Sequence, residues 1–306
     1  ALLWCGDMEK VSRSQSSDAD LLRQNVAGIK KRASLSIGYA ILAEARGKQL
    51  RESTAVFAGK LYGEAVTHFD RLVATVELGS SSSLDYLLGQ IRSIAAAARY
   101  KHTHSSVLGL NEIQDAYARC IPACEIYLRL LNQVVSKDAI ASASDVENRD
   151  EVAFVLLEAL HAMGKTEEGK ALFFRYFIRP EVGATSIWTV LAKTRIAKGL
   201  VDDGDYLTAY PLLSEVVRDA RQSGLRDIGF TAALMTGICI SKLNPVARGA
   251  ATPNDLAEHG RMGELRASGV QLARDAYSSA LAFLSDPADP DPVHYPDEFR
   301  EIFLDN

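Results

Sequence analysis

Two consecutive segments of the chain decide its fold: EVAFVLLEALHAMGKTEEGKALFFRYFIRP at residues 151–180 and SIWTVLAKTRIAKGLVDDGDYLTAYPLLSEVVRDARQSGLRD at residues 186–227. In each segment, apolar residues recur at helical spacing, run into a turn that contains a glycine (Gly164 or Gly204), and then resume at the same spacing. Apolar residues repeating every three to four positions are typical of an amphipathic helix. Each segment therefore predicts a helix–turn–helix unit.

The second helix of each unit carries a small residue four positions before a large apolar one. Residues four apart lie on one face of a helix, so this pairing lets the second helix lie close against the first. The same step occurs near the N-terminus, which predicts another unit there. The pairs are Gly169 with Phe173, Ala209 with Leu213, and Ala65 with Phe69.

Helical spacing continues on both sides of these segments, and the alternation typical of strands is absent. We expect further helices at about 25–46, 52–78, 84–100, 110–135, 228–243 and 264–284. Pro122 should kink or split the helix at 110–135, because proline lacks the amide hydrogen that a helix interior uses. Residues 136–150 are expected to form a polar connection. The chain is predicted to be all-α, with helical hairpins stacked as an α-solenoid.

The same pattern predicts the domain organisation. A Ser-rich N-terminus predicts a loosely ordered arm at 1–24, and the helical-repeat array is placed at 25–243. Two prolines and a glycine indicate a linker at 244–255. A C-terminal helical repeat is expected at 256–285, followed by an acidic, proline-rich tail at 286–306.

Composition excludes several classes of protein. The 306 residues are 47% hydrophobic and 24% charged, as in ordinary folded proteins, and the net charge of −5 argues against a general nucleic-acid-binding surface. Four cysteines are too few for a disulfide scaffold and favour a reducing compartment. No stretch approaches the roughly 18 consecutive apolar residues of a membrane helix, so no transmembrane segment is expected.

Three stretches resemble known helical repeats. VQLARDAYSSALAFLSDP at 270–287 resembles the second helix of a tetratricopeptide repeat, and Gly204 to Ala209 resembles the turn and second-helix start of the same motif. The unit that ends at Pro180 resembles a pentatricopeptide repeat, through Leu157, Ala159, Leu160, Gly164, Glu167, Glu168, Leu172, Phe173 and Arg179. Both families stack hairpins of about 34 residues into a right-handed superhelix with a concave face for partners. The resemblance covers about half of the chain.

Cys120 and Cys124 form the clearest candidate for a metal site. Their spacing of four points both thiols the same way, so that His102 or His104 could complete half of a site. The alternative, which we favour, is that both are small core residues on a kinked helix. We predict no metal and no other cofactor.

Other polar groups suggest solvated helix surfaces rather than reaction centres. His161 and His68 are expected on a helix face and at a packing position. The aspartates around Gly204 lack the remaining ligands of a calcium loop and are expected to start a helix. No phosphate loop, nucleophile elbow, paired carboxylates or zinc-protease motif occurs. We therefore predict no enzyme, no catalytic residue and no small-molecule substrate.

Our main hypothesis is a non-catalytic protein–protein interaction module, acting as a structural or accessory subunit of a larger assembly. Its partners would be other protein subunits, held against an extended helical surface. Several aromatic residues could anchor a partner if they are exposed. For most of them, the competing expectation is that they pack in the core. These candidates are Phe173, Tyr176, Phe177, Trp188, Tyr206 and Tyr210.

Two alternatives stay open. The first is an organellar RNA-binding protein of the pentatricopeptide kind, in which Arg218, Arg221 and Arg226 would face phosphate. The second is a tetratricopeptide lipoprotein of a bacterial envelope transport system, since Leu2-Leu3-Trp4-Cys5 resembles a lipoprotein cleavage site. The repeat resemblance and the absence of an initiator Met, which indicates a removed leader or a trimmed sequence, predict a mitochondrial or other organellar compartment.

Overall fold

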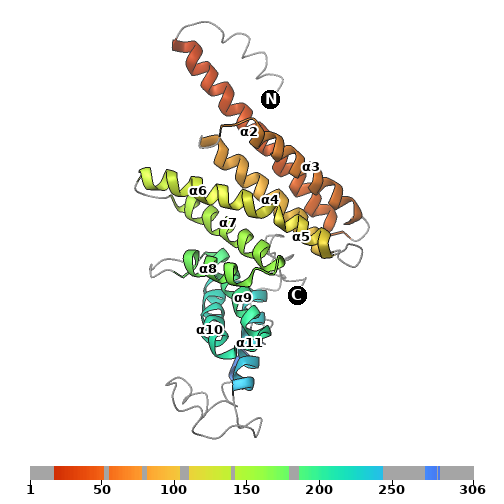
Figure 1. Ribbon diagram of the computed structural model, residues 1–306, viewed down its shortest axis with the longest axis vertical. Helices are drawn as coiled ribbons and strands as arrows, with labels where there is room; N and C mark the ends of the chain where they lie inside the picture. Colours follow the sequence, from red (N-terminus) through yellow and green to blue (C-terminus); the bar gives the residue numbers. More distant parts are fainter. Residues whose placement is uncertain are drawn as a thin grey trace. The chain divides into compact units, whose positions relative to one another are not determined.

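The computed structural model describes residues 17–51, 55–77, 81–103, 110–138, 142–178, 186–243, 273–280 and 282, and they form helices and the turns between them (Figure 1). The chain divides into two compact units, which we call unit 1 (Ala1–Lys165) and unit 2 (Thr166–Asn306) and describe separately. The all-α class with stacked helical hairpins is confirmed within each unit. None of the helices in the described ranges has both the length and the hydropathy needed to cross a membrane.

Unit 1 contains six described helices, in which neighbours along the chain pack side by side. They are α2 (Ser17–Gln49), α3 (Ala55–Ala74), α4 (Ser81–Thr103), α5 (Leu110–Ala118), α6 (Cys120–Asp138) and α7 (Ala143–Ala162). Helix α2 packs on α3, α3 on α4, and α6 on α7 (Figure 1). Helix α4 also contacts α5, α6 and α7, so it lies at the centre of the unit.

The Phe69 ring of α3 fills the space between α2 and α4. The ring is fully buried and approaches Gly38 of α2 and Gly89 of α4. A Cβ atom would lie 2.4 Å from the ring at Gly38 and 2.1 Å at Gly89, so neither position accepts a side chain without moving the ring. Ala65 is also fully buried, as the spacing of four residues predicted.

Two boundaries in unit 1 bear on the sequence predictions. Helices α5 and α6 are separated at Arg119, so the expected split is confirmed; Pro122 lies in the first turn of α6, where a missing amide hydrogen costs little. The prediction of a polar connection at 136–150 is wrong for most of that range. Helix α6 continues to Asp138 and α7 begins at Ala143.

A capping box explains the early start of α7. The Ser142 side chain accepts a hydrogen bond from the Asp145 amide at 3.2 Å, and the Asp145 carboxylate accepts one from the Ser142 amide at 3.1 Å. Each of the two residues thus supplies a side-chain acceptor to the backbone amide of the other, and the Asp145 amide also lies 3.1 Å from the Ser142 carbonyl. Helix α2 likewise begins at Ser17, inside the segment expected to be an arm.

Unit 2 contains α8 (Thr166–Tyr176), α9 (Ile187–Asp202), α10 (Tyr206–Ser223) and α11 (Arg226–Leu243), followed by a helical segment at residues 273–280. Helix α9 packs on α10, α10 on α11, and α8 on α9 (Figure 1). The linker expected at 244–255 and the tail expected at 286–306 lie outside the described residues. So do residues 1–16 and most of 256–285.

Three turns use the same glycine geometry. Gly164, Gly204 and Gly224 follow α7, α9 and α10, with φ angles of 72°, 79° and 69°. After Gly204, the Asp205 amide donates to the Leu200 carbonyl at 2.8 Å, and the amide of Gly204 donates to the third carbonyl before it. This Schellman arrangement satisfies carbonyls at the helix end and needs a residue that tolerates positive φ. The glycine turns predicted at 164 and 204 are therefore confirmed.

Candidate functional site

Among the described residues of unit 1, two ion pairs join α4 to α7. Arg92 donates from Nε and Nη2 to the two carboxylate oxygens of Glu151 at 2.7 and 2.6 Å. Its Nη1 donates to the Tyr39 hydroxyl at 3.2 Å, and the guanidinium lies 5.7 Å from the centre of the Tyr39 ring. A fork-to-fork geometry of this kind fixes both direction and distance between two helices.

The second pair repeats the first, seven residues further along both helices. Arg99 donates to Glu158 from Nε at 3.1 Å and from Nη2 at 2.5 Å. Arg99 follows Arg92 by seven residues on α4, and Glu158 follows Glu151 by seven residues on α7. The two helices therefore run in the same direction. Both side chains are buried, whereas Arg92 keeps 29% of its side-chain surface exposed. We call these two pairs the α4–α7 ladder.

Burial and nearby charges shift the pKa values of Arg92 and of two neighbouring tyrosines. Burial alone would lower the pKa of Arg92, but hydrogen bonding and attraction by Glu151 raise it above its ordinary value. Burial raises the pKa of Tyr39, and Arg92 offsets part of that shift. Burial, with Glu151 nearby, also raises the pKa of Tyr127 on α6. These groups keep their usual charge state at neutral pH, which suits a structural role better than proton transfer.

The two cysteines of α6 lie in the same interior. Cys120 and Cys124 are fully buried and carry free thiols. Burial is the main cause that raises the pKa of Cys120 to about 12, with a further contribution from Glu158, and burial raises that of Cys124 well above its ordinary value. A protonated, buried thiol is a poor nucleophile and a poor metal ligand. The favoured prediction of small core residues agrees with this placement.

The histidines singled out in the sequence do not converge on these cysteines. His102 is exposed at the end of α4, with its ring 6.4 Å from that of Tyr117. His68 packs against Phe69, and its Nε2 lies 2.9 Å from the Ser34 carbonyl oxygen. His161 is partly buried near the end of α7, and His104 lies outside the described residues. Within the described ranges, no group of three or more His, Cys, Asp or Glu is arranged to hold a metal ion.

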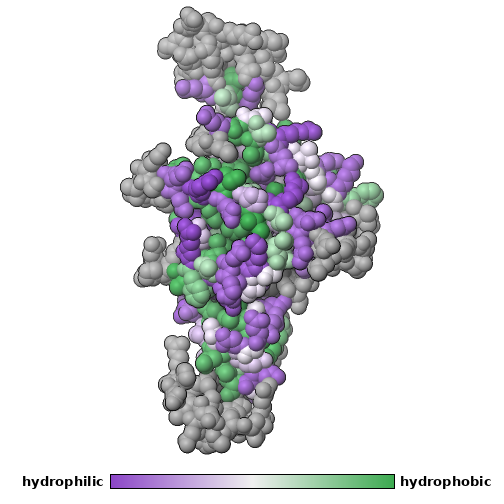
Figure 2. Space-filling model, viewed as in Figure 1, coloured by the Kyte–Doolittle hydropathy of each residue, from purple (hydrophilic) through white to green (hydrophobic). Residues whose placement is uncertain are grey.

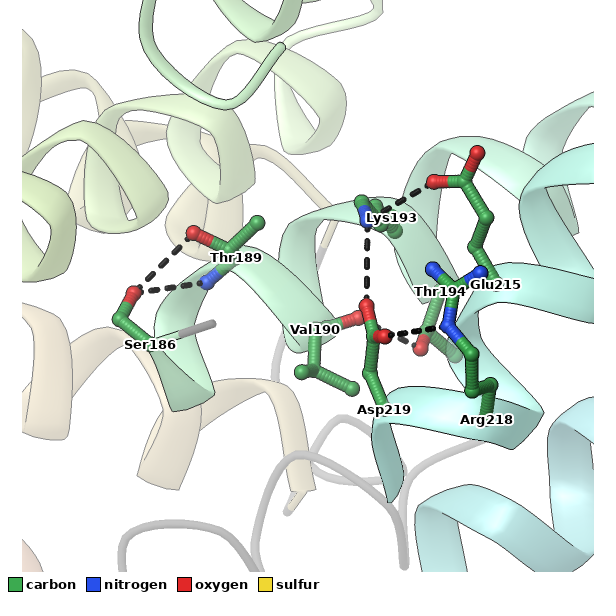
Figure 3. Close-up of polar contacts among 8 residues, drawn as sticks. All are labelled: Ser186, Thr189, Val190, Lys193, Thr194, Glu215, Arg218 and Asp219. Atoms are coloured by element: carbon green, nitrogen blue, oxygen red, sulfur yellow. Dashed lines mark hydrogen bonds and ion pairs between the residues drawn. The ribbon is translucent and has the colours of Figure 1, made fainter. Parts of the chain in front are cut away.

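Unit 2 has a different polar cluster, which joins neighbouring helices (Figure 3). Lys193 of α9 is buried, and its Nζ lies 2.9 Å from Glu215 and 3.2 Å from Asp219 on α10. Arg218 completes the cluster through its Nε, 3.3 Å from Asp219. Two cations face two carboxylates, so the cluster is balanced in charge. We call it the Lys193 cluster.

Two of the three arginines proposed for phosphate make internal contacts. Arg218 is exposed but pairs with Asp219, and Arg221 donates to the Ser279 hydroxyl. Arg226 is partly buried at the start of α11. The acidic residues of the Lys193 cluster lie beside Arg218, and this arrangement does not favour a phosphate-binding surface there.

The sequence also predicted that Asp205 starts a helix. Its carboxylate accepts a hydrogen bond from the Thr208 amide at 3.2 Å and caps α10. Asp202 and Asp203 are exposed at the end of α9. The expectation of a polar turn, rather than a cation loop, matches this geometry.

Most of the aromatic anchor candidates are buried. Phe173 stacks on Phe177 with ring centres 6.0 Å apart. Tyr206 and Tyr210 are only partly buried, and Tyr210 packs beside Ile240 of α11. The competing expectation of core packing thus describes four of the six: Phe173, Tyr176, Phe177 and Trp188.

The sequence did not indicate which large apolar side chains are exposed in the structure. Phe174 of α8 is 64% exposed, and Ile178, two residues past the end of α8 at Tyr176, is 44% exposed. The Phe177 amide donates to the Phe173 carbonyl at 2.9 Å, so the helical turn continues past Tyr176. We call Phe174 and Ile178 the α8 surface. Other exposed apolar residues are Ile37, Leu50, Phe57, Val134, Leu207 and Leu234. On the face drawn in Figure 2, apolar residues lie among hydrophilic ones.

No protein-family model matches the chain, and no curated protein matches it. Among solved structures, the chain is similar to a candidate kinesin light chain of Podosopora anserina with nearly identical TPR-like repeats. The two share 14% identity at a TM-score of 0.45, over 82% of this chain and 98% of that chain. A single-substitution variant of the same protein gives 16% identity and a TM-score of 0.41, over 81% of this chain and 97% of that one. The similarity to these structures concerns only the arrangement of the helices.

Proposed function

We propose that the chain is a non-catalytic module that binds other proteins and uses the α8 surface as one contact. The observation that supports this proposal is the exposure of Phe174 and Ile178 beside a helix whose inner face is well buried. Large exposed apolar side chains can mark protein–protein interaction sites. Aromatic side chains are also among the residues that contribute most to binding energy.

The polar groups of the described interior support the same proposal. The strongest ones, in the α4–α7 ladder and the Lys193 cluster, are engaged with one another and hold helices in place. Groups used in this way stabilise a scaffold, and a scaffold of packed helices presents its surface to a partner. A role as an accessory subunit of a larger assembly and a mitochondrial compartment remain predictions from the sequence.

A native co-purification from cells of the source organism tests the proposal. The tagged full chain is compared with the double variant Phe174→Ser/Ile178→Ser, in lysates treated with nuclease, and bound proteins are quantified by mass spectrometry. We expect stoichiometric partners on the unaltered chain, resistant to nuclease and lost from the double variant. Because both positions are exposed, melting temperatures should be nearly equal.

Leu234→Ser, an exposed position on α11, is the matched control and should keep the partners. If the double variant and the control retain the same partners, the α8 surface is not the contact. If nuclease releases every partner, the RNA-binding alternative replaces the proposal.

A further inference from the structure

Helix α2 carries a cluster of basic residues shortly before a serine. The sequence Lys31-Arg32-Ala33-Ser34-Leu35 has a lysine three positions and an arginine two positions before Ser34, and an apolar residue directly after it. Among the serines and threonines of the whole sequence, only Ser34 has Lys or Arg at both of these positions. Protein kinases select their substrates partly by such charge patterns around the acceptor hydroxyl. The pattern therefore indicates Ser34 as a candidate acceptor.

The basic residues and the serine are not enclosed by the helices around them. Arg32 is exposed, and Lys31 and Ser34 are partly exposed, whereas Ser93 of α4 is fully buried. Lys31 forms an ion pair with Asp85 of α4, whose side chain is 50% exposed. An exposed ion pair contributes little stability, so the Lys31 ammonium can exchange this carboxylate for one of a kinase.

Leu35 is the one residue of the pattern that packs in the interior. It lies against the core cluster that includes Leu42, Tyr62 and Phe69. Kinases bind the residues around the acceptor as an extended segment, whereas this part of α2 is helical. Phosphorylation therefore requires α2 to open from its N-terminal end as far as Leu35. Val26 is buried in the part that opens, so the folded chain should react more slowly than a free peptide.

The position of Ser34 in the α2–α3 hairpin allows such opening without loss of the whole contact. Nε2 of His68 lies 2.9 Å from the Ser34 carbonyl oxygen, so Ser34 lies opposite the last two turns of α3, which ends at Ala74. Opening of α2 up to this point leaves the packing of Phe69 against Gly38 in place. Local opening of this kind costs less free energy than global unfolding.

We propose that Ser34 is a phosphorylation site for a serine kinase that recognises basic residues two and three positions before the acceptor. The phosphoryl donor is ATP. The Ser34 Oγ forms a bond to the γ-phosphorus as the bond from that phosphorus to the oxygen of the β-phosphate breaks, and ADP leaves. The hydroxyl proton passes to a carboxylate of the kinase. The proposal concerns α2 and does not rest on the α8 surface.

The product changes the ion pairs of α2. A phosphoserine carries a charge of about −1.5 to −2 at neutral pH and three strong acceptor oxygens. Lys31 lies three positions before Ser34, and residues at this spacing are neighbours on a helix surface. The phosphate therefore competes with Asp85 for the Lys31 ammonium. Phosphorylation would replace a contact between α2 and α4 by one within α2.

The test uses the full chain, Mg-ATP and the catalytic subunit of cyclic-AMP-dependent protein kinase, which has this substrate preference. Incorporation of phosphate is followed over time, and the modified residue is located by tandem mass spectrometry. We expect phosphate on Ser34 and none at this site in Ser34→Ala. Arg32→Gln keeps the acceptor but removes one recognised charge, so its initial rate should fall by about tenfold or more.

Two variants serve as matched controls. Arg71→Gln removes an exposed cation from α3, and Ser36→Ala removes an exposed hydroxyl two residues from the acceptor. Both should be phosphorylated at the rate of the unaltered chain. Circular dichroism at the assay temperature checks that each variant is folded. A peptide of residues 28–38 provides the rate for an acceptor outside the fold.

The proposal is overturned if Ser34 of the full chain takes up no phosphate; uptake by the peptide alone would mean that the fold closes the site. It is also overturned if the phosphate is found on another residue in place of Ser34, or if Arg32→Gln reacts as fast as Arg71→Gln. Co-purification through the α8 surface is a separate readout, so failure of either proposal leaves the other standing.

Discussion

Helix α4 and residues 273–280 both pack on helices that are distant in the sequence, and they are held in opposite ways. The α4–α7 ladder uses two Arg–Glu pairs, seven residues apart, with buried or mostly buried carboxylates. The described contacts of the segment at 273–280 include three alanines, a tyrosine over Gly237 and a hydrogen bond from Arg221 to Ser279. The first contact specifies a register, because any shift would leave buried charges without partners. The second includes a fit between small side chains and one aromatic ring at Gly237.

The largest effect is expected from breaking the ladder at its buried end. Glu158→Ala leaves the Arg99 guanidinium buried without its carboxylate, which should lower the free energy of unfolding by about 3–5 kcal/mol. Urea denaturation of the purified chain measures the change. Glu147→Ala, exposed on the same helix, should change stability little. Equal losses for the two variants would show that the ladder does not hold α4 to α7.

Asp219→Ala in the Lys193 cluster should cost less, about 1–3 kcal/mol. Lys193 would keep Glu215 as a partner at 2.9 Å, so its charge would not be left alone. The same urea measurement gives the comparison. If Asp219→Ala lowered the free energy of unfolding as much as Glu158→Ala, Glu215 would not be compensating for the missing carboxylate. The two clusters would then not differ in this respect.

Much of the difference between these contacts could not be predicted from the sequence. Apolar periodicity and Gly204 are local signals, so the helices and their turns could be predicted from single segments. The start of α7 was misjudged because its first turns are polar and exposed, although Ser142 and Asp145 are a recognisable capping pair. Polar residues on a solvated helix face do not produce the apolar periodicity from which a helix is predicted.

The ladder joins residues 59 positions apart, and no local pattern pairs them. One signal was present: the interval of seven residues separates Arg92 from Arg99 and also Glu151 from Glu158. The aromatic residues were ambiguous for a related reason. Phe173 and Phe174 are adjacent and chemically identical, yet one is buried and the other exposed, because only the packing of α8 decides which face is covered.

A smaller effect is expected from the thiols beside the ladder. Burial raises the pKa of Cys120 from its ordinary 9.0 to about 12, so the folded chain keeps a proton that the unfolded chain releases. Stability should therefore be unaffected below about pH 9 and should fall as the pH rises from there towards about 12. Melting temperatures of the unaltered chain and Cys120→Ala, compared between about pH 8 and pH 10, measure this. The variant should lose less stability; an equal loss would contradict the burial of this thiol.

The smallest change is expected when both members of the buried pair are removed together. Arg99→Leu/Glu158→Leu removes both charges of this pair, so its stability should lie within about 1 kcal/mol of the unaltered chain or above it. The difference from Glu158→Ala then separates the cost of an uncompensated charge from the net contribution of the pair. A double variant as unstable as the single one would mean that packing at this position, rather than charge, had been lost.

Native-state hydrogen exchange, read by mass spectrometry, tests most directly whether unit 1 is fixed while the last helix of unit 2 is releasable. Amides of α4 and α7 should exchange only through global unfolding. Those of residues 273–280 should exchange faster than those of α11 by on the order of a hundredfold or more, through local release. Exchange at 273–280 as slow as in α4 would contradict the account, because the two contacts would then be equally stable.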